Sequence, residues 1–466
     1  MLFNSYEFLF FLLPIILAGY YLVLPKPFRN GWLLVCSYVF YGWWDIRYCS
    51  LLLLVTSIDY VAGKRISMAR TKSGRRGWLA AAVCCDLSIL GFFKYYDFGA
   101  AALNGLADVL GGSAPVLPIL HIALPIGISF YVFQSMSYSI DIYRGIAKPA
   151  HGFIDFACYV SLFPQLIAGP IVRYHELAGQ LQQRTHSTAK AGAGIAIFIL
   201  GLAKKVILAD SVSLIADWGF GASGIGFWGA WTSLAAYTLQ IYFDFSGYSD
   251  MAVGLGLLFG FQFPQNFNSP YKSASITEFW RRWHISLSSW LRDNLYIPLG
   301  GNRKGEGRTY FNLFATMLLG GLWHGSSWTF VLWGAYHGIW LALERRHGKG
   351  SYLRRFPRPV QIGGTFLIVM LGWLLFRSTS LQELGWMLQG LAGWNGLGGG
   401  YPLGGMGVAA WAILLLGLWM VFACRNTWEI RLRPTLMACS LLLVLFVACV
   451  AIILLNTSSP FLYFQF

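Results

Sequence analysis

Residues 437–455 read Met-Ala-Cys-Ser-Leu-Leu-Leu-Val-Leu-Phe-Val-Ala-Cys-Val-Ala-Ile-Ile-Leu-Leu, without a single charged side chain. A helix of about 20 such residues is long enough to cross the ~30 Å hydrocarbon core of a bilayer. Similar runs along the chain give about ten to twelve candidate spans, whose boundaries between residues 141 and 264 are not sharp. The sequence therefore predicts an all-α fold, a polytopic integral membrane helix bundle with additional re-entrant or interfacial helices. The clearest other runs are residues 8–24, 78–93, 119–140, 360–376 and 408–424.

The composition excludes an ordinary soluble protein. Hydrophobic residues make up 56% of the chain and charged residues only 11%, whereas soluble domains carry about 25% charged residues. The net charge of +15 lies in loops between the apolar runs, so it indicates cytoplasmic loops rather than nucleic-acid binding. Three basic blocks stand in such loops: Lys64, Arg65, Arg70, Lys72, Arg75 and Arg76; Arg345, Arg346, Lys349, Arg354, Arg355 and Arg358; and Arg425, Arg431 and Arg433.

These charges predict the orientation of the chain. If the basic blocks stay inside, both termini lie outside. Residues 94–118 and 378–405 are then outer loops, and residues 153–169, which Pro164 interrupts, form a re-entrant segment. The first run has neither a basic flank nor a cleavage site, so we expect a retained span. No linker divides the chain, and we expect one membrane domain over residues 1–466.

The eight cysteines suggest no chemistry. They lie mostly inside apolar runs, and none has the CxxC spacing of a metal or redox site. Membrane cysteines behave as small hydrophobic residues, so we expect no metal centre and no permanently bound cofactor.

The longest polar insertion between the apolar runs covers residues 264–308, where we expect a cytosolic or interfacial segment. Ser275 followed by Glu278 has the spacing of a capping box, which predicts a helix from Ile276. We expect this helix at the membrane–water boundary, with its tryptophans at headgroup depth. The alternative is a scaffold helix whose arginines extend to water. Its apolar face consists of Trp280, Trp283, Leu287, Trp290 and Leu291.

His284 falls on the apolar side of this helix, close to a basic cluster. A lone histidine in such a position is often structural, and that alternative stays open. The cluster favours a functional interpretation, because arginine binds phosphate through two parallel hydrogen bonds. We therefore expect a phosphorylated acyl carrier to enter from the cytosol here. The expected donor-binding residues are Arg281, Arg282, Arg292, Trp280 and Trp283, and Arg303, Lys304 and Arg308 extend the cluster.

His324 stands in Leu-Gly-Gly-Leu-Trp-His-Gly-Ser-Ser-Trp, residues 319–328, within an apolar run. If a helix enters the membrane near Thr309, roughly fifteen residues rise about 22 Å, which leaves His324 inside the core. Ionisable groups there are functional candidates, and desolvation favours the neutral imidazole that a general base requires. Gly320, Gly321 and Gly325 allow a backbone or a ligand to approach closely. The alternative is a buried histidine that ties two helices together, which is our interpretation of His337.

Two carboxylates, Asp244 and Asp250, interrupt the apolar stretch 227–263. Residues six apart do not share a helical face, so a paired acid–base site is disfavoured unless Gly247 breaks the helix. One of them could orient a histidine or cap a broken helix. Structural hydrogen bonding is the alternative.

Several motifs resemble those of the membrane-bound O-acyltransferase family. They are Leu124-Pro-Ile-Gly-Ile-Ser-Phe, Phe163-Pro-Gln-Leu-Ile-Ala-Gly-Pro, Asp244-Phe-Ser-Gly-Tyr-Ser-Asp, Phe279-Trp-Arg-Arg-Trp-His and Gly321-Leu-Trp-His-Gly, and the C-terminal Phe461-Leu-Tyr-Phe-Gln-Phe also fits. They follow in family order over nearly the whole chain. The resemblance is strongest to the bacterial branch that acetylates exported polysaccharides, to which the D-alanine exporter of teichoic acid modification is related.

The resemblance implies a helix bundle with a central tunnel in a bacterial inner membrane, with both termini in the periplasm. His324 matches the family's signature catalytic histidine, His284 matches a second functional histidine, and Trp323, Asp244 and Asp250 are expected to support them. Acetyl groups would come from cytosolic acetyl-CoA. A periplasmic partner of the SGNH hydrolase type, or a polysaccharide-export complex, would complete their transfer to an alginate- or cellulose-like polymer.

Two other functions remain compatible with the residues alone. A polysaccharide or lipid transporter, or a flippase, would explain the spans and the intramembrane charges without acyl chemistry. A lipid acyltransferase would use the same histidine on a different acceptor. The sequence names neither the polymer nor the oligomeric state.

Overall fold

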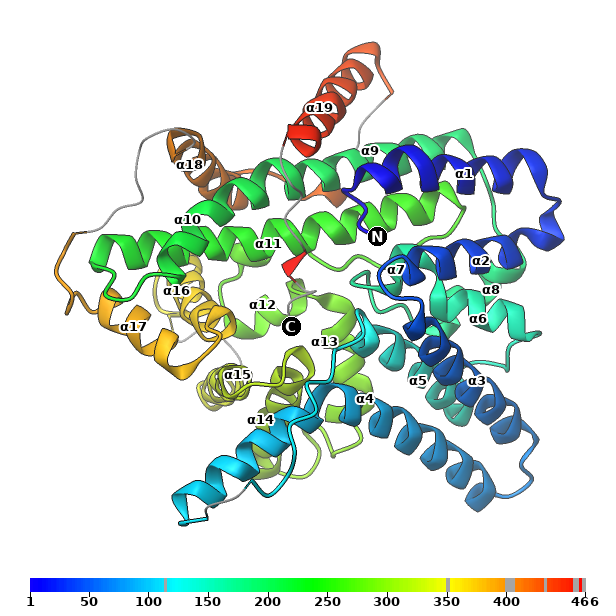
Figure 1. Cartoon of the computed structure of the whole chain (residues 1–466), viewed down its shortest axis with the longest axis horizontal. Coiled ribbons are helices and arrows are strands. Elements are labelled where there is room, and N and C mark those ends of the chain that lie inside the picture. The colour runs from blue at the N-terminus through cyan, green and yellow to red at the C-terminus, as the bar shows by residue number, and fades with distance from the viewer. Residues whose placement is uncertain (113–114, 349–352, 399–406, 431–433, 456–460, 463–466) are drawn as a thin grey trace. The chain divides into compact units, whose positions relative to one another are not determined.

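The computed structural model of the chain is built from helices, and the described residues contain no strand (Figure 1). The structure describes residues 1–112, 115–348, 353–398, 407–430, 434–455 and 461–462. Residue contacts divide the chain into unit 1, Met1–Ile195 with Ala252–Phe263, and unit 2, Ala196–Met251 with Pro264–Phe466. Helices α9 (Thr188–Ala203) and α11 (Phe227–Leu258) contribute residues to both units. The all-α prediction is confirmed, and the single domain stays a prediction.

Unit 1 begins with one continuous apolar helix, in which α1 (Leu13–Ala18) lies between the π-helical stretches η1 (Phe8–Leu12) and η2 (Gly19–Val23). Within the unit, α3, α4 and α5 pack against one another and α2 packs against α6. The remaining elements are η3 (Lys26–Phe28), α2 (Arg29–Gly42), α3 (Arg47–Met68), α4 (Lys72–Val109), α5 (Ile128–Arg144), α6 (Phe153–Ser161), α7 (Phe163–Leu166) and α8 (Tyr174–Gln182).

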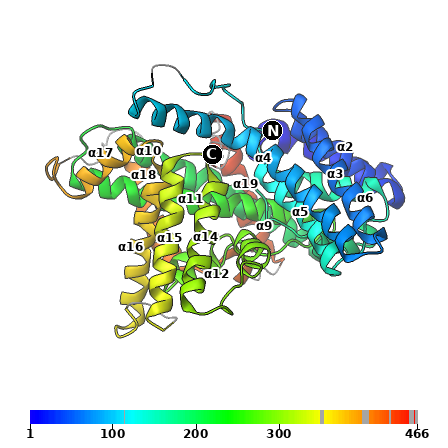
Figure 2. The same ribbon diagram turned by 90° about the horizontal axis from the view of Figure 1, so that it is seen from below.

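Unit 2 carries the three helices that matter most for the site, α14 (Glu306–His324), α15 (Trp328–Arg346) and α16 (Arg358–Arg377). They run side by side in Figure 2, and α15 packs against both of the others. The other elements are η4 (Lys204–Ala209), α10 (Asp210–Phe220), η5 (Pro270–Lys272), α12 (Ile276–Arg282), α13 (Ile285–Leu291), η6 (Arg292–Tyr296), α17 (Leu381–Leu391), α18 (Gly407–Ala423), η7 (Thr427–Glu429) and α19 (Leu436–Leu455).

The predicted spans near the C-terminus are confirmed as helices. Runs 360–376, 408–424 and 437–455 correspond to α16, α18 and α19, each within two residues of the predicted bounds. Among the described residues, four helices are long and apolar enough to cross a membrane: Lys72–Val109, Thr188–Phe220, Arg358–Arg377 and Leu436–Leu455. Two shorter apolar helices cover Phe8–Val23 and Gly407–Ala423. These features are those of a multi-pass membrane protein, while the count of ten to twelve spans stays a prediction.

Two predicted boundaries in unit 1 are wrong. The outer loop was expected to begin at residue 94, but α4 continues to Val109. Lys94 does not end the helix because it is buried, with its Nζ 3.3 Å from Ser129 Oγ. Within residues 153–169 the helices α6 and α7 are separated at Leu162, two residues before Pro164, and the re-entrant segment stays a prediction.

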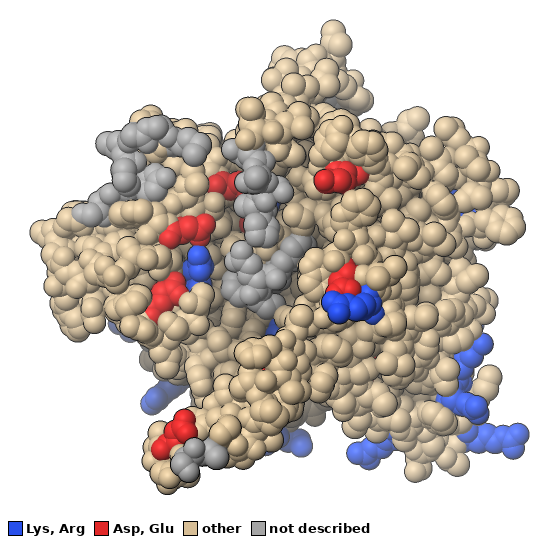
Figure 3. Space-filling view, in the orientation of Figure 1, with Lys and Arg blue, Asp and Glu red and all other residues tan. Residues whose placement is uncertain are grey.

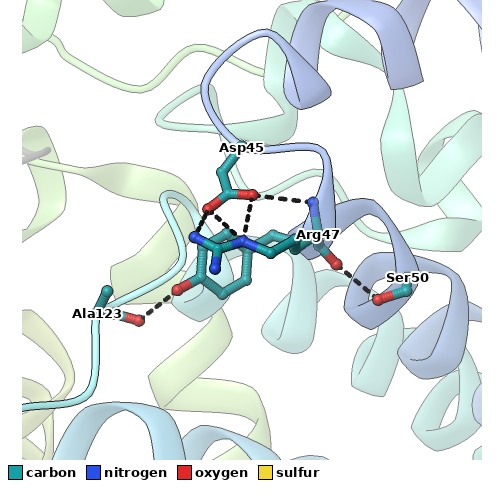
Figure 4. A network of polar contacts seen from close by, with 5 residues as sticks. Asp45, Arg47, Ser50 and Ala123 are labelled. Carbon is teal, nitrogen blue, oxygen red and sulfur yellow. Dashed lines mark hydrogen bonds and ion pairs between the residues drawn. The ribbon is translucent and has the colours of Figure 1, made fainter.

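The second wrong boundary concerns residues 119–127, which were predicted to begin a span but are non-helical. Asp97 of α4 accepts from the Leu120 and Ile122 amides at 2.8 and 2.7 Å, and a polar network near the start of α3 also contacts the stretch (Figure 4). The Tyr48 hydroxyl donates to the Ala123 carbonyl at 2.9 Å, which ties this stretch to α3. Beside it, Arg47 Nη2 lies 2.6 Å from Asp45 Oδ2, and the Arg47 guanidinium lowers the pKa of Asp45. The helix therefore starts only at Ile128, after Gly127 in a left-handed conformation.

Charged side chains are sparse on the face shown in Figure 3. Lys and Arg gather at its lower right edge, where the end of α3 and the start of α4 carry the first basic block. Parts of the other two blocks (Lys349, Arg431 and Arg433) and residues 463–466 of the C-terminal motif lie outside the described residues.

Candidate functional site

Unit 2 contains a cavity of about 440 Å³ that brings His324 together with two arginines. Its wall is mostly apolar, and its volume is in the range of small-molecule pockets. The lining residues come from α12, α13, η6, α14 and α15: Thr277, Trp280, Arg281, Ile285, Leu287, Ser288, Ser289, Leu291, Arg292, Tyr296, Leu313, Thr316, Met317, Gly320, His324, Trp333 and Leu341.

His324 is the last residue of α14 and is almost fully buried. Aromatic rings surround its imidazole, with centroid distances of 4.9 Å to Trp323, 5.1 Å to Trp333 and 5.2 Å to Phe376. Such walls exclude water from the ring. The carbonyl end of a helix favours positive charge, so the position also stabilises an imidazolium that forms transiently.

Glycines permit the close packing around His324, as the sequence predicted. A Cβ at Gly321 would lie 2.4 Å from the Phe330 carbonyl oxygen, so α14 and α15 meet there at backbone distance. A Cβ at Gly325 would lie 2.0 Å from the Phe330 ring. Gly320, one turn before His324, lines the cavity opposite Leu291. These residues leave room for the cavity on one side and for the partner helix on the other.

His284 lies between two helices rather than within the single helix predicted from Ile276. The capping box is confirmed, because Ser275 Oγ accepts from the Glu278 amide at 3.0 Å. However, α12 ends at Arg282, and His284 adopts a left-handed conformation (φ 42°) before α13 begins. A non-glycine residue in this region is uncommon. The helix prediction failed here because the capping and periodicity signals continue through the break.

Asn266 holds His284 in this conformation. Its Oδ1 lies 3.1 Å from His284 Nδ1 and accepts from the Ser286 amide and hydroxyl. Its carbonyl oxygen accepts from the Ile285 amide at 2.9 Å. Because Oδ1 is an acceptor, His284 Nδ1 carries the proton and Nε2 is the basic nitrogen. Burial lowers the pKa of His284, which lies between the predicted spans, to about 3, so the ring is neutral near pH 7.

The two candidate histidines lie close together. Their ring centroids are 6.5 Å apart, and the Trp323 ring is 6.1 Å from His284 and 4.9 Å from His324. The sequence placed His284 on a helix at the membrane–water boundary. In the structure its ring is fully buried within the protein, beside that of His324.

The predicted donor-binding arginines separate into two groups. Arg281 and Arg292 line the cavity, although Arg292 Nε also lies 2.6 Å from Asp293 Oδ1, which raises the pKa of Arg292. Arg282 does not line it. Its Nη2 lies 2.8 Å from Glu278 Oε1, so its charge is compensated one turn away.

The tryptophans separate in the same way. Trp280 lines the cavity, and its Nε1 donates to His337 Nδ1 at 3.4 Å. Trp283 is fully buried among aromatic rings, 4.7 Å from Trp373 and 5.0 Å from Phe267. Trp283 therefore packs into the aromatic core of unit 2, and its depth in the membrane stays a prediction.

The aspartates form ion pairs with consecutive lysines that the sequence analysis missed. Asp244 lies 2.8 Å from Lys205 Nζ, and Asp250 lies 2.6 Å from Lys204 Nζ and accepts from Thr427 Oγ1. Helix α11 continues through Gly247, so it does not break there. Their described partners support the structural alternative over a role in orienting a histidine. The sequence contained a signal for these ion pairs, because two lysines, Lys204 and Lys205, interrupt the apolar run 188–220.

Two further residues position the site: Glu344, which was not predicted, and His337. Glu344 is buried on α15, and its carboxylate accepts from the Ile276 and Thr277 amides at 2.6 and 2.8 Å. It thereby fixes the start of α12 to α15. His337 supports Trp280 and stacks on Phe279, which agrees with its structural interpretation. The sequence signal that could have identified Glu344 is a carboxylate within an otherwise apolar run.

Comparisons with known proteins identify the same family as the motifs whose residues converge here. The sequence model of the membrane-bound O-acyltransferase (MBOAT) family matches residues 143–357, which include both histidines. A probable alginate O-acetylase of Pseudomonas putida is 46% identical over the whole of both chains. The corresponding protein of Pseudomonas aeruginosa is 51% identical over 82% of this chain and 73% of its own. A peptidoglycan O-acetyltransferase of Helicobacter pylori is 38% identical over 85% of this chain and 81% of its own.

Proposed function

Because the chain belongs to the membrane-bound O-acyltransferase family, we propose that this O-acyltransferase acetylates hydroxyl groups of an exported polysaccharide. The names of the relatives support a cell-envelope polymer, alginate in Pseudomonas and peptidoglycan in Helicobacter. We assign the chain to a bacterial inner membrane, with cytosolic acetyl-CoA as the donor and an alginate- or cellulose-like polymer as the final acceptor. A periplasmic SGNH-type partner would complete delivery to the polymer.

One observation carries the proposal: His324 and the side chains of Arg281 and Arg292 line the same cavity. Guanidinium groups recognise phosphate, and a phosphorylated thioester such as acetyl-CoA presents phosphates at one end and the acyl carbon at the other. With its phosphates near the arginines, the donor would direct its acyl group along the apolar wall toward His324. Trp280 and Trp333 would cover the reacting end and exclude water.

His324 then acts as a general base. It accepts the proton of the acceptor hydroxyl as the hydroxyl oxygen attacks the thioester carbonyl. The tetrahedral intermediate collapses, the C–S bond breaks, and the leaving thiolate takes the proton from the imidazolium. The products are the acetyl ester and the free thiol. An acetyl-imidazole on His324, which is then transferred to the acceptor, is the covalent variant of the same route.

His284 contributes through its neutral ring. With Nδ1 donating to Asn266, Nε2 is held as an acceptor in the vicinity of His324. We assign it to proton relay or orientation beside His324. Asn266 and Trp323 are positioning residues in this scheme, because they fix the two rings rather than touch the reacting atoms.

Mass analysis of the exported polysaccharide tests the proposal. A strain that lacks this chain is compared with the same strain carrying it, and labelled acetyl-CoA is supplied to isolated membranes. We expect O-acetyl groups on the polymer, and label in it, only when the chain is present. Intact polymer transport without label transfer would instead identify a transporter or flippase. Preference for long-chain acyl-CoA, with label in lipid, would identify a lipid acyltransferase.

A further inference from the structure

Unit 1 carries a cluster of cations where its first apolar helix ends. Helix α1 continues through η2 to Val23, and after a short turn α2 begins at Arg29. Arg184 and His186 lie in the connection that follows α8. We call Tyr20, Arg29, Arg184 and His186 the Tyr20 cluster.

The phenol of Tyr20 organises this cluster. Its hydroxyl accepts from Arg184 Nε at 2.8 Å and lies 3.0 Å from His186 Nε2. Both guanidinium groups also approach its ring: the Arg29 Cζ is 4.7 Å and the Arg184 Cζ 5.6 Å from the centroid. Two like charges are thus held beside one aromatic ring, and an anion that binds between them would lower their mutual repulsion.

The described residues place no carboxylate within ion-pair distance of either arginine. Arg184 Nη1 donates to the amide oxygen of Asn30 at 2.7 Å instead. Asp155 accepts from the Asn30 amide nitrogen at 2.7 Å, so it serves the amide rather than a guanidinium. Burial and then the charges of Arg29 and Arg184 lower the pKa of His186. Among the described residues, no carboxylate therefore forms a direct ion pair with either guanidinium group of the cluster.

The surroundings of the cluster are those of a lipid headgroup region. Leu22, Val23 and Phe28 are 84%, 72% and 64% exposed, so an apolar surface borders the cations. Lys26 and Lys190 add positive charge on the exposed side. Tyrosines and basic residues at the end of an apolar helix are typical of the membrane–water interface, where basic residues attract anionic lipids.

We propose that the Tyr20 cluster binds the phosphodiester headgroup of an anionic phospholipid, whose acyl chains lie along the exposed apolar residues of η2 and η3. Arg29 and Arg184 would contact the phosphate oxygens, which suit the planar guanidinium group. A soluble phosphate compound shares the anion chemistry but leaves Leu22, Val23 and Phe28 uncovered. For this reason we assign the site to a lipid.

Native mass spectrometry and competitive lipid binding test the assignment on the full chain. Protein in mixed nanodiscs is offered phosphatidylglycerol or phosphatidylcholine of the same acyl composition. We expect preferential retention of phosphatidylglycerol in the unaltered chain. Each basic side chain contributes roughly fivefold to binding at a membrane surface, so R29Q/R184Q should lower this preference by about 25-fold. R70Q/K72Q, which removes equal charge from the exposed α3–α4 connection, should retain it.

Three results decide the proposal. Equal preference in R29Q/R184Q and the unaltered chain would overturn it, as would no preference in the unaltered chain. Loss of the preference on addition of millimolar inorganic phosphate would identify a soluble-anion site instead. Because glutamine could disturb the fold, R29K/R184K serves as a second variant. It keeps the charge, and we expect it to retain more of the preference than R29Q/R184Q at an equal melting temperature.

Discussion

At the scale of single residues, the site is a pair of buried histidines enclosed by aromatic rings. His324 ends a helix and faces the cavity, and His284 is held behind it by a three-donor interaction with Asn266 Oδ1. Burying an unpaired polar group has a large free-energy cost. The Asn266 side chain avoids this cost for His284 Nδ1 by accepting its hydrogen bond. The basic Nε2 of His284 is thereby fixed before any substrate binds.

Replacing Asn266 by Asp should change the pH dependence of the enzyme. Burial lowers the pKa of His284 to about 3, and a carboxylate at position 266 would raise it by about 1 unit or more. Protonated His284 cannot relay a proton, so the acidic limb of the pH–rate profile should move to higher pH in N266D. The same change in the H284N background should leave that limb in place. A shift of the limb in H284N/N266D as well would contradict a role for His284.

The neighbouring arginines offer a matched comparison for donor binding. Arg281 lines the cavity, whereas Arg282 pairs with Glu278 outside it. R281Q should raise the KM for acetyl-CoA by about 10- to 150-fold, since a charge-assisted phosphate contact is worth roughly 1.5–3 kcal/mol. Its kcat should change little. Steady-state kinetics in which R282Q raises KM as much as R281Q would remove the cavity from the donor path.

At the scale of elements, the close contact of α14 and α15 determines where His324 lies. G321V would force a side chain against the Phe330 carbonyl, 2.4 Å from the position of its Cβ. Overpacking of this kind costs about 1–3 kcal/mol, and the separation of the helices should displace His324. We expect a lower melting temperature and loss of acetyl transfer. G307A on the same helix, where no atom lies within 4 Å, should melt no lower than the unaltered chain; a lower value would contradict this explanation.

The long apolar helices could be predicted from the sequence because hydropathy and length act locally. Helices α16, α18 and α19 follow their runs closely. The break at His284 and the continuation of α4 through Lys94 could not be predicted, because each depends on a distant partner, Asn266 in one case and Ser129 in the other. The same distinction between local and long-range signals separates the site residues that could be predicted from those that could not. His324, His284 and Arg281 stand in recognisable motifs, while Glu344 and the lysines that pair with the aspartates act through contacts between separate elements.

At the scale of the whole molecule, the loop charges make a prediction that cysteine labelling can check. In a variant without the eight native cysteines, S73C at the start of α4 and Q382C at the start of α17 are both exposed. The positive-inside rule puts the first in the cytoplasm and the second in the periplasm. An impermeant maleimide added to intact spheroplasts should label Q382C alone. Labelling of S73C alone would reverse the orientation, and with it the side from which the donor enters.

The central claim is that His324 performs the acyl transfer, and one measurement tests it most directly. Membranes with equal amounts of the unaltered chain, H324A or H151A receive labelled acetyl-CoA, and label on the exported polymer is counted. His151 is an exposed histidine between α5 and α6, so H151A should match the unaltered chain. General acid–base catalysis contributes about 10²–10⁴-fold, so H324A should fall by at least ~10²-fold while its melting temperature stays unchanged. Undiminished acetyl transfer by H324A would contradict the account.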